Sequence, residues 1–247
     1  MPRSIKRNPL GEQVTDAIIE LIAEQNLRAG DRLPSSNDLS DLLGVSVPVV
    51  REAMAGLAAI GLLERHQGRE STVATPNSSH LSRLLSLRVV GSSVDDEQLQ
   101  QFREIVEVGN ARLAARNRSE DDLVALDERL SLLSAAKTSE DLHEADVAFH
   151  AAVARATGND LCELTLESLE PILWRLRRRV WNGWVNAGGG VTSIIEAHAV
   201  ILRAIRAGDG DGAATAMSQH LAQARSGLDE SLRKGDVAVA PKAGFPG

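Results

Sequence analysis

"SSNDLSDLLGVSVPVVREAMAGLAAIG", residues 35–61, has the layout of two helices separated by a tight turn. Ser35 is followed by Asp38 three residues on, the spacing of a capping box, which predicts the start of the first helix. Gly44 is expected to end that helix, because glycine readily takes the left-handed conformation of a helix C-terminus. Ser46 can cap the second helix, and apolar residues recur along it at helical spacing. The stretch therefore predicts a helix-turn-helix.

The flanking residues complete a small domain around this unit. Residues 10–26 place apolar side chains on one face and predict an amphipathic helix. Two short pieces, 62–66 and 71–75, are joined by the turn-like QGRE at 67–70, and they predict a β-hairpin. Three helices and a two-stranded hairpin within residues 1–75 predict a winged helix-turn-helix, which is a DNA-binding domain.

The remainder of the chain is predicted to be helical. Residues 76–95 are expected to form a linker and a connecting helix, residues 96–234 an effector-binding and dimerisation domain, and residues 235–247 a disordered tail. The predicted helices are 81–90, 96–117, 120–136, 140–156, 160–185 (bent at Pro171), 193–207 and 212–233, with capping serines at Ser93, Ser119 and Ser193. Short connections favour antiparallel packing. The fold class is therefore mainly α, with an N-terminal winged helix-turn-helix plus a C-terminal all-α antiparallel helical bundle.

Composition narrows the class of protein. The chain has 247 residues, 43% of them hydrophobic, and almost no strand-favouring aromatic residues, which is typical of a helical protein with a real core. The single cysteine, Cys162, excludes an internal disulfide and fits a reducing cytosol. No signal peptide follows the basic start, and no apolar run approaches the roughly 20 residues that span a bilayer. We expect a cytoplasmic protein with no membrane partner.

The net charge of −7 argues against a nonspecific polyanion binder, so contacts with DNA must depend on where the basic residues lie. The N-terminus of the second helix normally reaches base edges, and the wing reaches phosphates. The candidate DNA-binding residues are Ser35, Asn37, Ser46, Val47, Val49 and Arg51 in the helices and Arg65, His66, Gly68 and Arg69 in the wing. A small helical domain with a solvated charged rim explains these charges nearly as well.

"GDRLPSSNDLSDLLGVSVPVVREAMAGLAAIGLLERHQGRESTV" resembles the winged-helix domain of the GntR family of bacterial transcription regulators. The shared features are G-x-x-LPS, DLSDLLGVS, VREAM and the wing R-x-x-G, and they cover most of residues 10–75. Three positions depart from the family: Asn37 and Val47 stand where arginine is common, and Glu70 replaces the wing's second glycine. Asn37 can still pair with adenine, and Val47 can contact a thymine methyl. We therefore expect an operator unlike those of better-known relatives.

A second group of residues points to a metal site in the helical half. Asp146 and His150, in "DVAFH", lie one helical turn apart on an inward face. His198 and His220 lie on the apolar stripes of two later helices. Burying these groups without partners is costly, and a metal dication would pair with all four. A satisfied core histidine or a plain Asp–His hydrogen bond explains each residue singly, whereas the set favours a metal. His66, His80 and His143 are expected at the surface.

A resemblance supports the same site. "DVAFHAAVARATGN" and "EAHAVILRAIRAGDGDGAATAMSQH" resemble the C-terminal ligand domain of the FadR-type branch of the family, and the resemblance covers about 80–233. Asp146, His150, His198 and His220 fall on the four metal-ligand positions of that branch. The resemblance implies an all-α bundle that binds a divalent metal ion, Zn or Ni, with a small carboxylate effector completing the coordination.

The effector contacts are predicted from the same resemblance. "QFREIVEVGNARLAA" resembles the helix that opens this domain, where an arginine often holds the carboxylate; here it is Arg103, with Glu107 one turn on. A surface Arg–Glu pair explains these two residues equally well. "WRLRRRVWNGW" offers Trp174, Trp181 and Trp184 as a pocket or dimer wall and Arg175, Arg178 or Arg179 as anchors, although such a charge run is usually solvated. The predicted effector-binding residues are Arg103, Glu107, Asn159, Arg175 and Trp181.

Three functions fit these observations. The first is a ligand-responsive transcription regulator, not an enzyme, whose homodimer binds a pseudo-palindromic double-stranded DNA operator and is released by a sugar acid or hydroxy acid. The second is a metal-dependent hydrolase with an accessory domain, but no candidate base or nucleophile is found near the cluster. The third is a metal-ion sensor, which ranks lower because four ligands without thiolate leave room for exogenous oxygen ligands. We favour the regulator.

Overall fold

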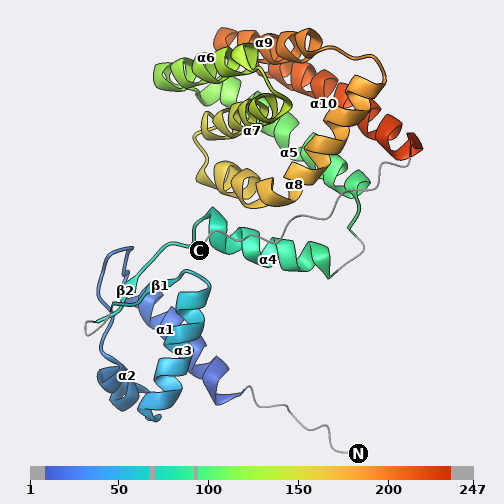
Figure 1. Ribbon diagram of the computed structural model, residues 1–247. Helices are drawn as coiled ribbons and strands as arrows, with labels where there is room; N and C mark the ends of the chain where they lie inside the picture. Colours follow the sequence, from blue (N-terminus) through green and yellow to red (C-terminus); the bar gives the residue numbers. More distant parts are fainter. Residues whose placement is uncertain (1–8, 67–69, 92–93, 235–247) are drawn as a thin grey trace, which may run out of the picture. The chain divides into compact units, whose positions relative to one another are not determined.

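The structure is a computed structural model of the chain and describes residues 9–66, 70–91 and 94–234 (Figure 1). The chain forms two compact units, which divide between Arg83 and Leu84. The mainly helical fold class predicted from the sequence is confirmed. No single helix within the described ranges has the length and apolar character to cross a membrane; only α2 and α3, a sharply bent pair, meet those criteria when taken together.

The first unit is a three-helix domain with a small hairpin. Its elements are α1 (Leu10–Glu24), α2 (Ser36–Leu43), α3 (Val47–Ala59), β1 (Leu63–Glu64) and β2 (Thr72–Val73). The two strands pair antiparallel, with Leu63 opposite Val73. Apolar side chains from all these elements form one core, which includes Ile18, Leu39 and Leu57. The strands are shorter than the predicted 62–66 and 71–75, but the predicted winged helix-turn-helix architecture is present.

The turn between α2 and α3 follows the local chemistry of the sequence. Ser35 and Asp38 form the predicted capping box at the start of α2. Gly44 ends α2 with φ of +65°, the left-handed conformation that glycine adopts at no steric cost. Ser46 is the N-cap residue of α3, but its side chain makes no capping hydrogen bond. The hydroxyl of Ser46 is therefore not used by the helix.

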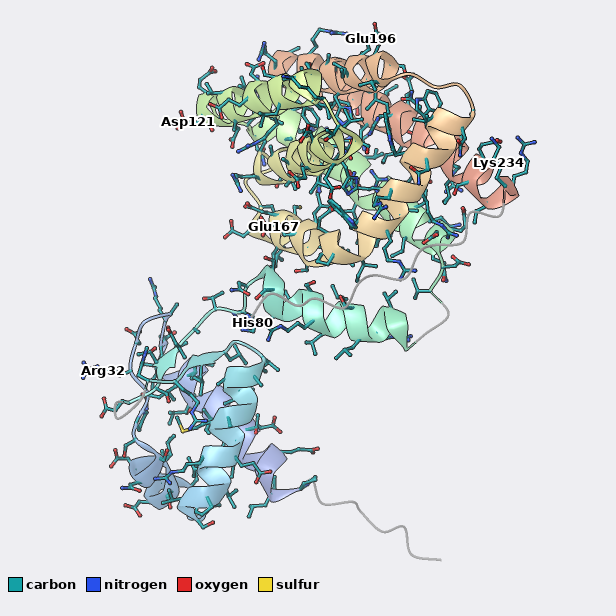
Figure 2. The ribbon with its side chains drawn as sticks, in the orientation of Figure 1. Arg32, His80, Asp121, Glu167, Glu196 and Lys234 are labelled. Atoms are coloured by element: carbon teal, nitrogen blue, oxygen red, sulfur yellow. The ribbon has the colours of Figure 1, made fainter. Side chains whose placement is uncertain are left out.

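The second unit is a bundle of long helices. After α4 (Ser78–Val90), it contains α5 (Asp96–Asn117), α6 (Glu120–Ala135), α7 (Ser139–Arg155), α8 (Asp160–Asn186), α9 (Val191–Ala207) and α10 (Gly210–Lys234). The helix α10 packs against α5, α8 and α9, and α7 packs against α5, α6 and α8. Pro171 lies inside α8, whose ribbon changes direction along its length, as expected (Figure 1). Acidic side chains such as Asp121, Glu167 and Glu196 point away from the bundle (Figure 2).

Some helix starts differ from the sequence prediction in position, and α5 begins at the predicted residue 96 but with a different cap. The helix α4 begins at Ser78, inside the expected linker segment, because the Asn77 side chain accepts hydrogen bonds from the amides of Ser79 and His80. Asp95 caps α5 with Gln98 in a capping box, whereas the predicted cap, Ser93, lies outside the described residues. Gly190 is the N-cap of α9, so Ser193 lies within the first turn and the prediction that it caps the helix is wrong. The capping box at Ser119 is confirmed.

Two glycines allow α8 and α10 to approach closely. A Cβ atom on Gly183 would lie 1.8 Å from the Gly227 carbonyl oxygen, and one on Gly227 would lie 2.4 Å from the Val180 carbonyl oxygen. These contacts are to backbone atoms, which cannot rotate away. The crossing brings the C-terminal half of α8 against α10, and both helices line the cavity described below.

Candidate metal centre

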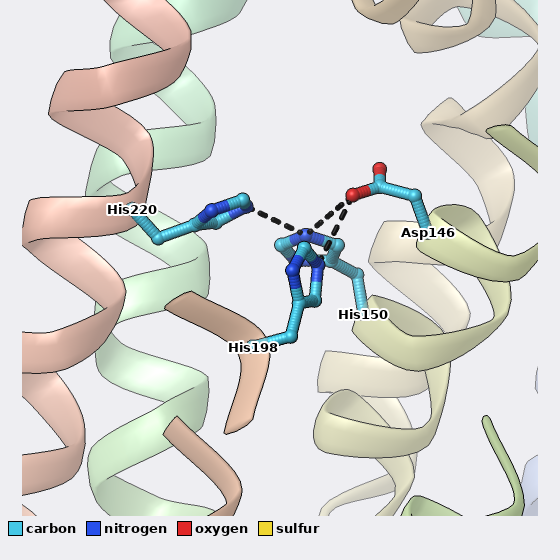
Figure 3. Close-up of side chains that lie close together, drawn as sticks. All are labelled: Asp146, His150, His198 and His220. Atoms are coloured by element: carbon cyan, nitrogen blue, oxygen red, sulfur yellow. Dashed lines mark hydrogen bonds and ion pairs between the residues drawn. The ribbon is translucent and has the colours of Figure 1, made fainter. Parts of the chain in front are cut away.

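Four side chains from three helices converge in the interior of the bundle (Figure 3). Asp146 and His150 lie one turn apart on α7, His198 is on α9 and His220 is on α10. One potential ligand atom from each lies within 4.8 Å of all the others. The three imidazoles are buried, and the aspartate side chain is 18% exposed. The structure therefore brings together the four residues that the sequence grouped.

The separations match those of donors around one ion. The Nε2 atom of His198 lies 3.1 Å from Asp146 Oδ1, and the Nε2 atom of His150 lies 3.7 Å from the same oxygen. The Nε2 atoms of His150 and His220 are 3.3 Å apart. Tetrahedral ligands with bonds of about 2.0–2.1 Å to zinc are about 3.3 Å from one another, by geometry. The three separations are near this value, and the four groups lie close enough together to hold a single cation.

A hydrogen bond on the far side of one imidazole and an ion-pair contact on the far side of another indicate which nitrogen of each ring faces the centre. The Nδ1 atom of His198 lies 2.8 Å from the carbonyl oxygen of Ile194, which can only accept, so Nδ1 carries the proton. The Nδ1 atom of His150 contacts the Glu107 carboxylate, which likewise accepts. In neutral rings both Nε2 atoms then present lone pairs to the centre. Such a partner on the outer nitrogen is typical of metal-bound histidine.

Protonation of the histidines, without a metal ion, does not explain why these four side chains lie so close together. Without a cation, the buried Nε2 atom of His198 has no hydrogen-bond partner among the described residues. Its ring centroid lies 5.4 Å from that of His150, whose pKa Glu107 and Asp146 raise against the effect of burial, so a second protonated ring beside it would be costly. Burial, reinforced by the other two histidines, holds the pKa of His220 well below its usual range, so this ring stays neutral. The donor set fits a divalent cation.

Two buried arginines balance the carboxylates around the centre. Arg103 Nε donates to Glu107 at 2.7 Å, and Arg177 Nη1 donates to Asp146 Oδ2 at 2.8 Å. Burial alone would raise the pKa of Glu107, but Arg103, His150 and Arg177 together hold it well below its usual range. Burial opposes ionisation of Asp146 too, yet a positive charge at His150, together with Arg177, keeps the pKa of Asp146 well below the ordinary value, and a bound cation would supply the same charge with His150 neutral. Both carboxylates are therefore charged at neutral pH.

A cavity opens beside the four residues and shares Asp146 and His220 with them. Its volume is about 60 Å³. Arg103 and Arg177 also line it, and neither Arg103 Nη2 nor Arg177 Nη2 donates a hydrogen bond to the described residues. The cavity thus offers guanidinium groups with unused donors next to the candidate metal centre.

The structure places the five predicted effector-binding residues differently. Arg103 and Trp181 line the cavity. Glu107 does not line it but lies behind it, between Arg103 and His150. Asn159 accepts a hydrogen bond from the amide of Leu161 as the N-cap of α8, and Arg175 is exposed, so the structure brings neither of these two to the cavity.

Among the cavity residues that were not predicted, two are ionisable. Arg177 is 3% exposed, and the sequence did not distinguish it from the other arginines of the same run. Its spacing from Leu173, Leu176 and Val180 puts it on the apolar stripe of α8, a signal that could have singled it out. The expectation that His143 lies at the surface is wrong: it is 8% exposed, its ring packs edge-on against Trp174, and it lines the cavity.

In the first unit, several predicted DNA-binding residues surround a surface hollow. Ser35, Asn37, Arg51 and His66 line it together with Arg32. Arg65 and Ser46 are exposed, Val47 is half-buried, and Val49 packs partly against the core. Gly68 and Arg69 lie outside the described residues. Glu70, which replaces the wing's second glycine, forms an ion pair with Arg32, whose Nη1 lies 3.8 Å from Glu70 Oε2.

Comparisons with protein families agree with this two-part organisation. Residues 10–73 match the family profile described as bacterial regulatory proteins, gntR family. Residues 98–223 match the FCD domain profile. The second match includes all four residues of the candidate metal centre as well as Arg103 and Arg177.

Curated proteins and solved structures are similar over most of the chain. The HTH-type transcriptional regulator LutR of Bacillus subtilis is 32% identical over 81% of this chain and 93% of its own length. The HTH-type transcriptional repressor NanR of Klebsiella aerogenes is 31% identical, over 88% of this chain and 86% of its own. The Glc operon transcriptional activator of Escherichia coli is 31% identical over 68% of this chain and 69% of its own length. A solved Streptococcus agalactiae GntR structure, 25% identical, covers 87% of this chain and 99% of its own with a TM-score of 0.62. These proteins are transcription regulators, not enzymes.

Proposed function

Since the chain belongs to the GntR family of bacterial regulatory proteins and carries an FCD effector-binding domain, we propose that it is a metal-dependent repressor released from DNA by a small carboxylate. It would act in the cytoplasm as a homodimer whose two winged helices bind a pseudo-palindromic operator. The effector would favour one arrangement of the helices only through a higher affinity for that arrangement.

The convergence of Asp146, His150, His198 and His220 carries the metal part of the proposal. The contacts of the outer nitrogens, from His198 Nδ1 to the Ile194 carbonyl oxygen and from His150 Nδ1 to the Glu107 carboxylate, support an orientation in which both Nε2 atoms face Asp146. Zn or Ni is the ion expected for an imidazole-rich site without thiolate. When bound, the ion supplies positive charge and open positions for oxygen ligands.

The charges around the cavity support an anionic effector. Asp146 and Glu107 carry one negative charge each, and Arg103 and Arg177 carry one positive charge each, so the four side chains sum to zero. Burial raises the pKa of Glu170, the further carboxyl beside Arg177, which limits its negative charge. A dication therefore leaves the site with net positive charge. A carboxylate restores the balance, and the unused guanidinium donors can bind its oxygens.

The direct test uses protein loaded with Zn²⁺ or Ni²⁺ and a fluorescent DNA fragment selected from a random library. A small carboxylate is expected to raise the melting temperature and to release the DNA at the same concentrations. Chelation of the metal should abolish both effects. Retention of DNA with every carboxylate that binds would contradict the repressor part of the proposal, and indifference to chelation would contradict the metal part.

Arg51→Ala is expected to weaken binding to this DNA by roughly tenfold or more, because a base or phosphate contact by arginine contributes about 1–3 kcal/mol. Arg51 is exposed on α3 and lines the hollow beside Asn37. The slope of log affinity against log salt should also fall by about one. Gel shifts at several salt concentrations measure both. Arg83→Ala, an exposed position on α4 outside the hollow, is the control, and equal affinity for the two variants would remove Arg51 from the interface.

Glu107→Gln is expected to weaken metal binding by about 10–100-fold, the loss typical when the hydrogen-bond partner of a metal-binding histidine is changed. The amide can present either oxygen or NH₂ to His150 Nδ1, so the orientation that points Nε2 at the centre is no longer fixed. Competition with a metal indicator dye measures the affinity. The control is Glu104→Gln on the same helix, which alters the ion pair with Arg225 and should leave the metal affinity unchanged. Equal losses of affinity in both variants would contradict the role of Glu107 in orienting His150.

A further inference from the structure

The wing of the first unit carries a basic and an acidic side chain that form an ion pair, Arg32 with Glu70. We propose that Arg32 binds a phosphate of the DNA backbone, and that Glu70 competes with this phosphate for the guanidinium group and so weakens DNA binding. The inference rests on the proposed function, because it adds a pair of residues to the same DNA-binding surface.

Backbone contacts hold Arg32 beside the second strand of the wing. The amide of Leu33 donates to the Ser71 carbonyl oxygen at 2.9 Å. Arg32 itself pairs with Thr72 of β2 in an isolated antiparallel bridge. The segment that contains Arg32 therefore runs along the edge of the wing, and the position of Arg32 is set by the backbone rather than by its side chain.

The register of this bridge explains why Arg32 meets Glu70. Glu70 lies two residues before Thr72, the bridge partner of Arg32, and alternation along a strand puts its side chain on the same face. Neighbours in this diagonal relation are within reach of long side chains. The opposite face carries Leu33 and Val73, which are buried in the core. The ion pair thus lies on the outer face of the wing.

The two charged side chains also line the surface hollow of the first unit, together with Asn37 of α2 and Arg51 of α3. The Arg32 side chain extends from the edge of this unit into solvent (Figure 2). In a helix-turn-helix protein the first helix of the motif crosses the DNA backbone and the second lies in the major groove. Because the hollow joins these helices to the wing, backbone phosphates are the DNA groups expected nearest to Arg32.

The ion pair is weak enough to be exchanged for a phosphate. Arg32 Nη1 lies 3.8 Å from Glu70 Oε2, and the two side chains are 80% and 46% exposed. Ion pairs this exposed contribute little, because water and salt screen them. Arginine binds phosphate through charge-assisted hydrogen bonds, which are stronger. A phosphate that reaches the hollow should therefore displace Glu70 from Arg32.

The exchange leaves the Glu70 carboxylate without its partner beside the DNA. A basic side chain that neutralises a phosphate releases about one counterion, which is why affinity for DNA falls as salt rises. An unpaired carboxylate next to the phosphates attracts a cation, and this uptake offsets the release that Arg32 causes. Among the described residues that line the hollow, Glu70 is the only acidic one. Glu70 should thus lower both the affinity for DNA and its dependence on salt.

Glu70→Gln tests the competition, because the amide keeps the size of the side chain and removes its charge. We expect this variant to bind DNA roughly threefold or more tightly at about 0.1 M salt, with the slope of log affinity against log salt steeper by about one. The gain should be equal for the selected DNA and for an unrelated duplex of the same length, because phosphate contacts carry no sequence information. Fluorescence anisotropy at several salt concentrations measures both quantities.

A double-mutant cycle shows whether Arg32 is the group for which Glu70 competes. In the Glu70→Gln background, Arg32→Ala should remove the whole gain in affinity and make the slope shallower by about one. In the wild-type background, Arg32→Ala should leave the slope nearly unchanged, because counterion release and cation uptake already cancel there. If Glu70→Gln gives the same gain with and without Arg32, the two residues act independently and the competition is refuted.

Glu64→Gln is the matched control for charge. Glu64 is exposed and lies opposite Thr72 on β1, but it does not line the hollow. This variant removes the same charge from the same small sheet and should leave affinity and slope close to those of the wild type. An equal gain from Glu64→Gln would assign the effect to the net charge of the wing and overturn the proposal.

The outcomes separate this inference from the proposed function. If the wild-type protein binds neither the selected DNA nor the unrelated duplex, the proposed function fails and the inference fails with it. If the wild type binds DNA and Glu70→Gln binds it with unchanged affinity and slope, only the inference is wrong. Arg51→Ala still tests the contact made by α3 in that case.

Discussion

His198→Ala is expected to lower metal affinity by more than the roughly 10–100-fold that follows from changing a ligand's hydrogen-bond partner. The ring is fully buried, and its Nδ1–H bond to Ile194 points Nε2 at the centre, so the variant removes one ligand nitrogen. Wild-type protein should melt at a higher temperature with added Zn²⁺ or Ni²⁺, since a ligand that binds only the folded state stabilises it. The variant should show no such shift. Elemental analysis after dialysis measures the bound metal.

Two further variants keep this test interpretable. Asp146→Asn preserves the shape of the side chain but removes its charge, so it should lose metal even if His198→Ala leaves a destabilising cavity. His66→Ala removes an exposed histidine of the first unit and should retain full metal content. Stoichiometric metal in both His198→Ala and Asp146→Asn would refute the metal centre.

Gly183→Ala is expected to destabilise the second unit by about 3 kcal/mol or more, at or above the upper end of ordinary overpacking. The new Cβ would lie 1.8 Å from the Gly227 carbonyl oxygen, so α8 and α10 must move apart. For a unit of this size such a loss lowers the melting temperature by roughly 6–12 °C. Carboxylate binding should weaken as well, because Val180, Trp181 and Trp184 on α8 and Ala224 on α10 line the same cavity.

Gly109→Ala is the matched control for this crossing. Gly109 is exposed on α5, and a Cβ atom there meets nothing within 4 Å. Alanine is the better helix former by about 0.8–1.0 kcal/mol, so this variant should melt slightly higher than the wild type. If Gly183→Ala behaves like Gly109→Ala, the close approach of the two helices is not needed for the fold.

Much of the local structure could be predicted because it depends on neighbours in the chain. The capping box at Ser35, the left-handed Gly44 and the one-turn spacing of Asp146 and His150 are all set within a few residues. Ser193 shows the limit of such rules: it has an acid three residues on, yet α9 begins before it. A sequence pattern can predict that a helix starts nearby without determining the residue at which it begins.

The sequence by itself determined the helices, the winged helix-turn-helix and the grouping of one aspartate with three histidines, because periodicity and capping are short-range properties of the chain. Only the tertiary structure decided which groups surround them. Arg177 and His143 line the cavity, Glu107 orients His150 from behind, and Arg175 points to solvent. These roles depend on the rotation and crossing of helices that are far apart in sequence, and at Gly183 and Gly227 the crossing distance is set by the absence of a side chain. Helical periodicity identifies a face, but packing decides what that face meets.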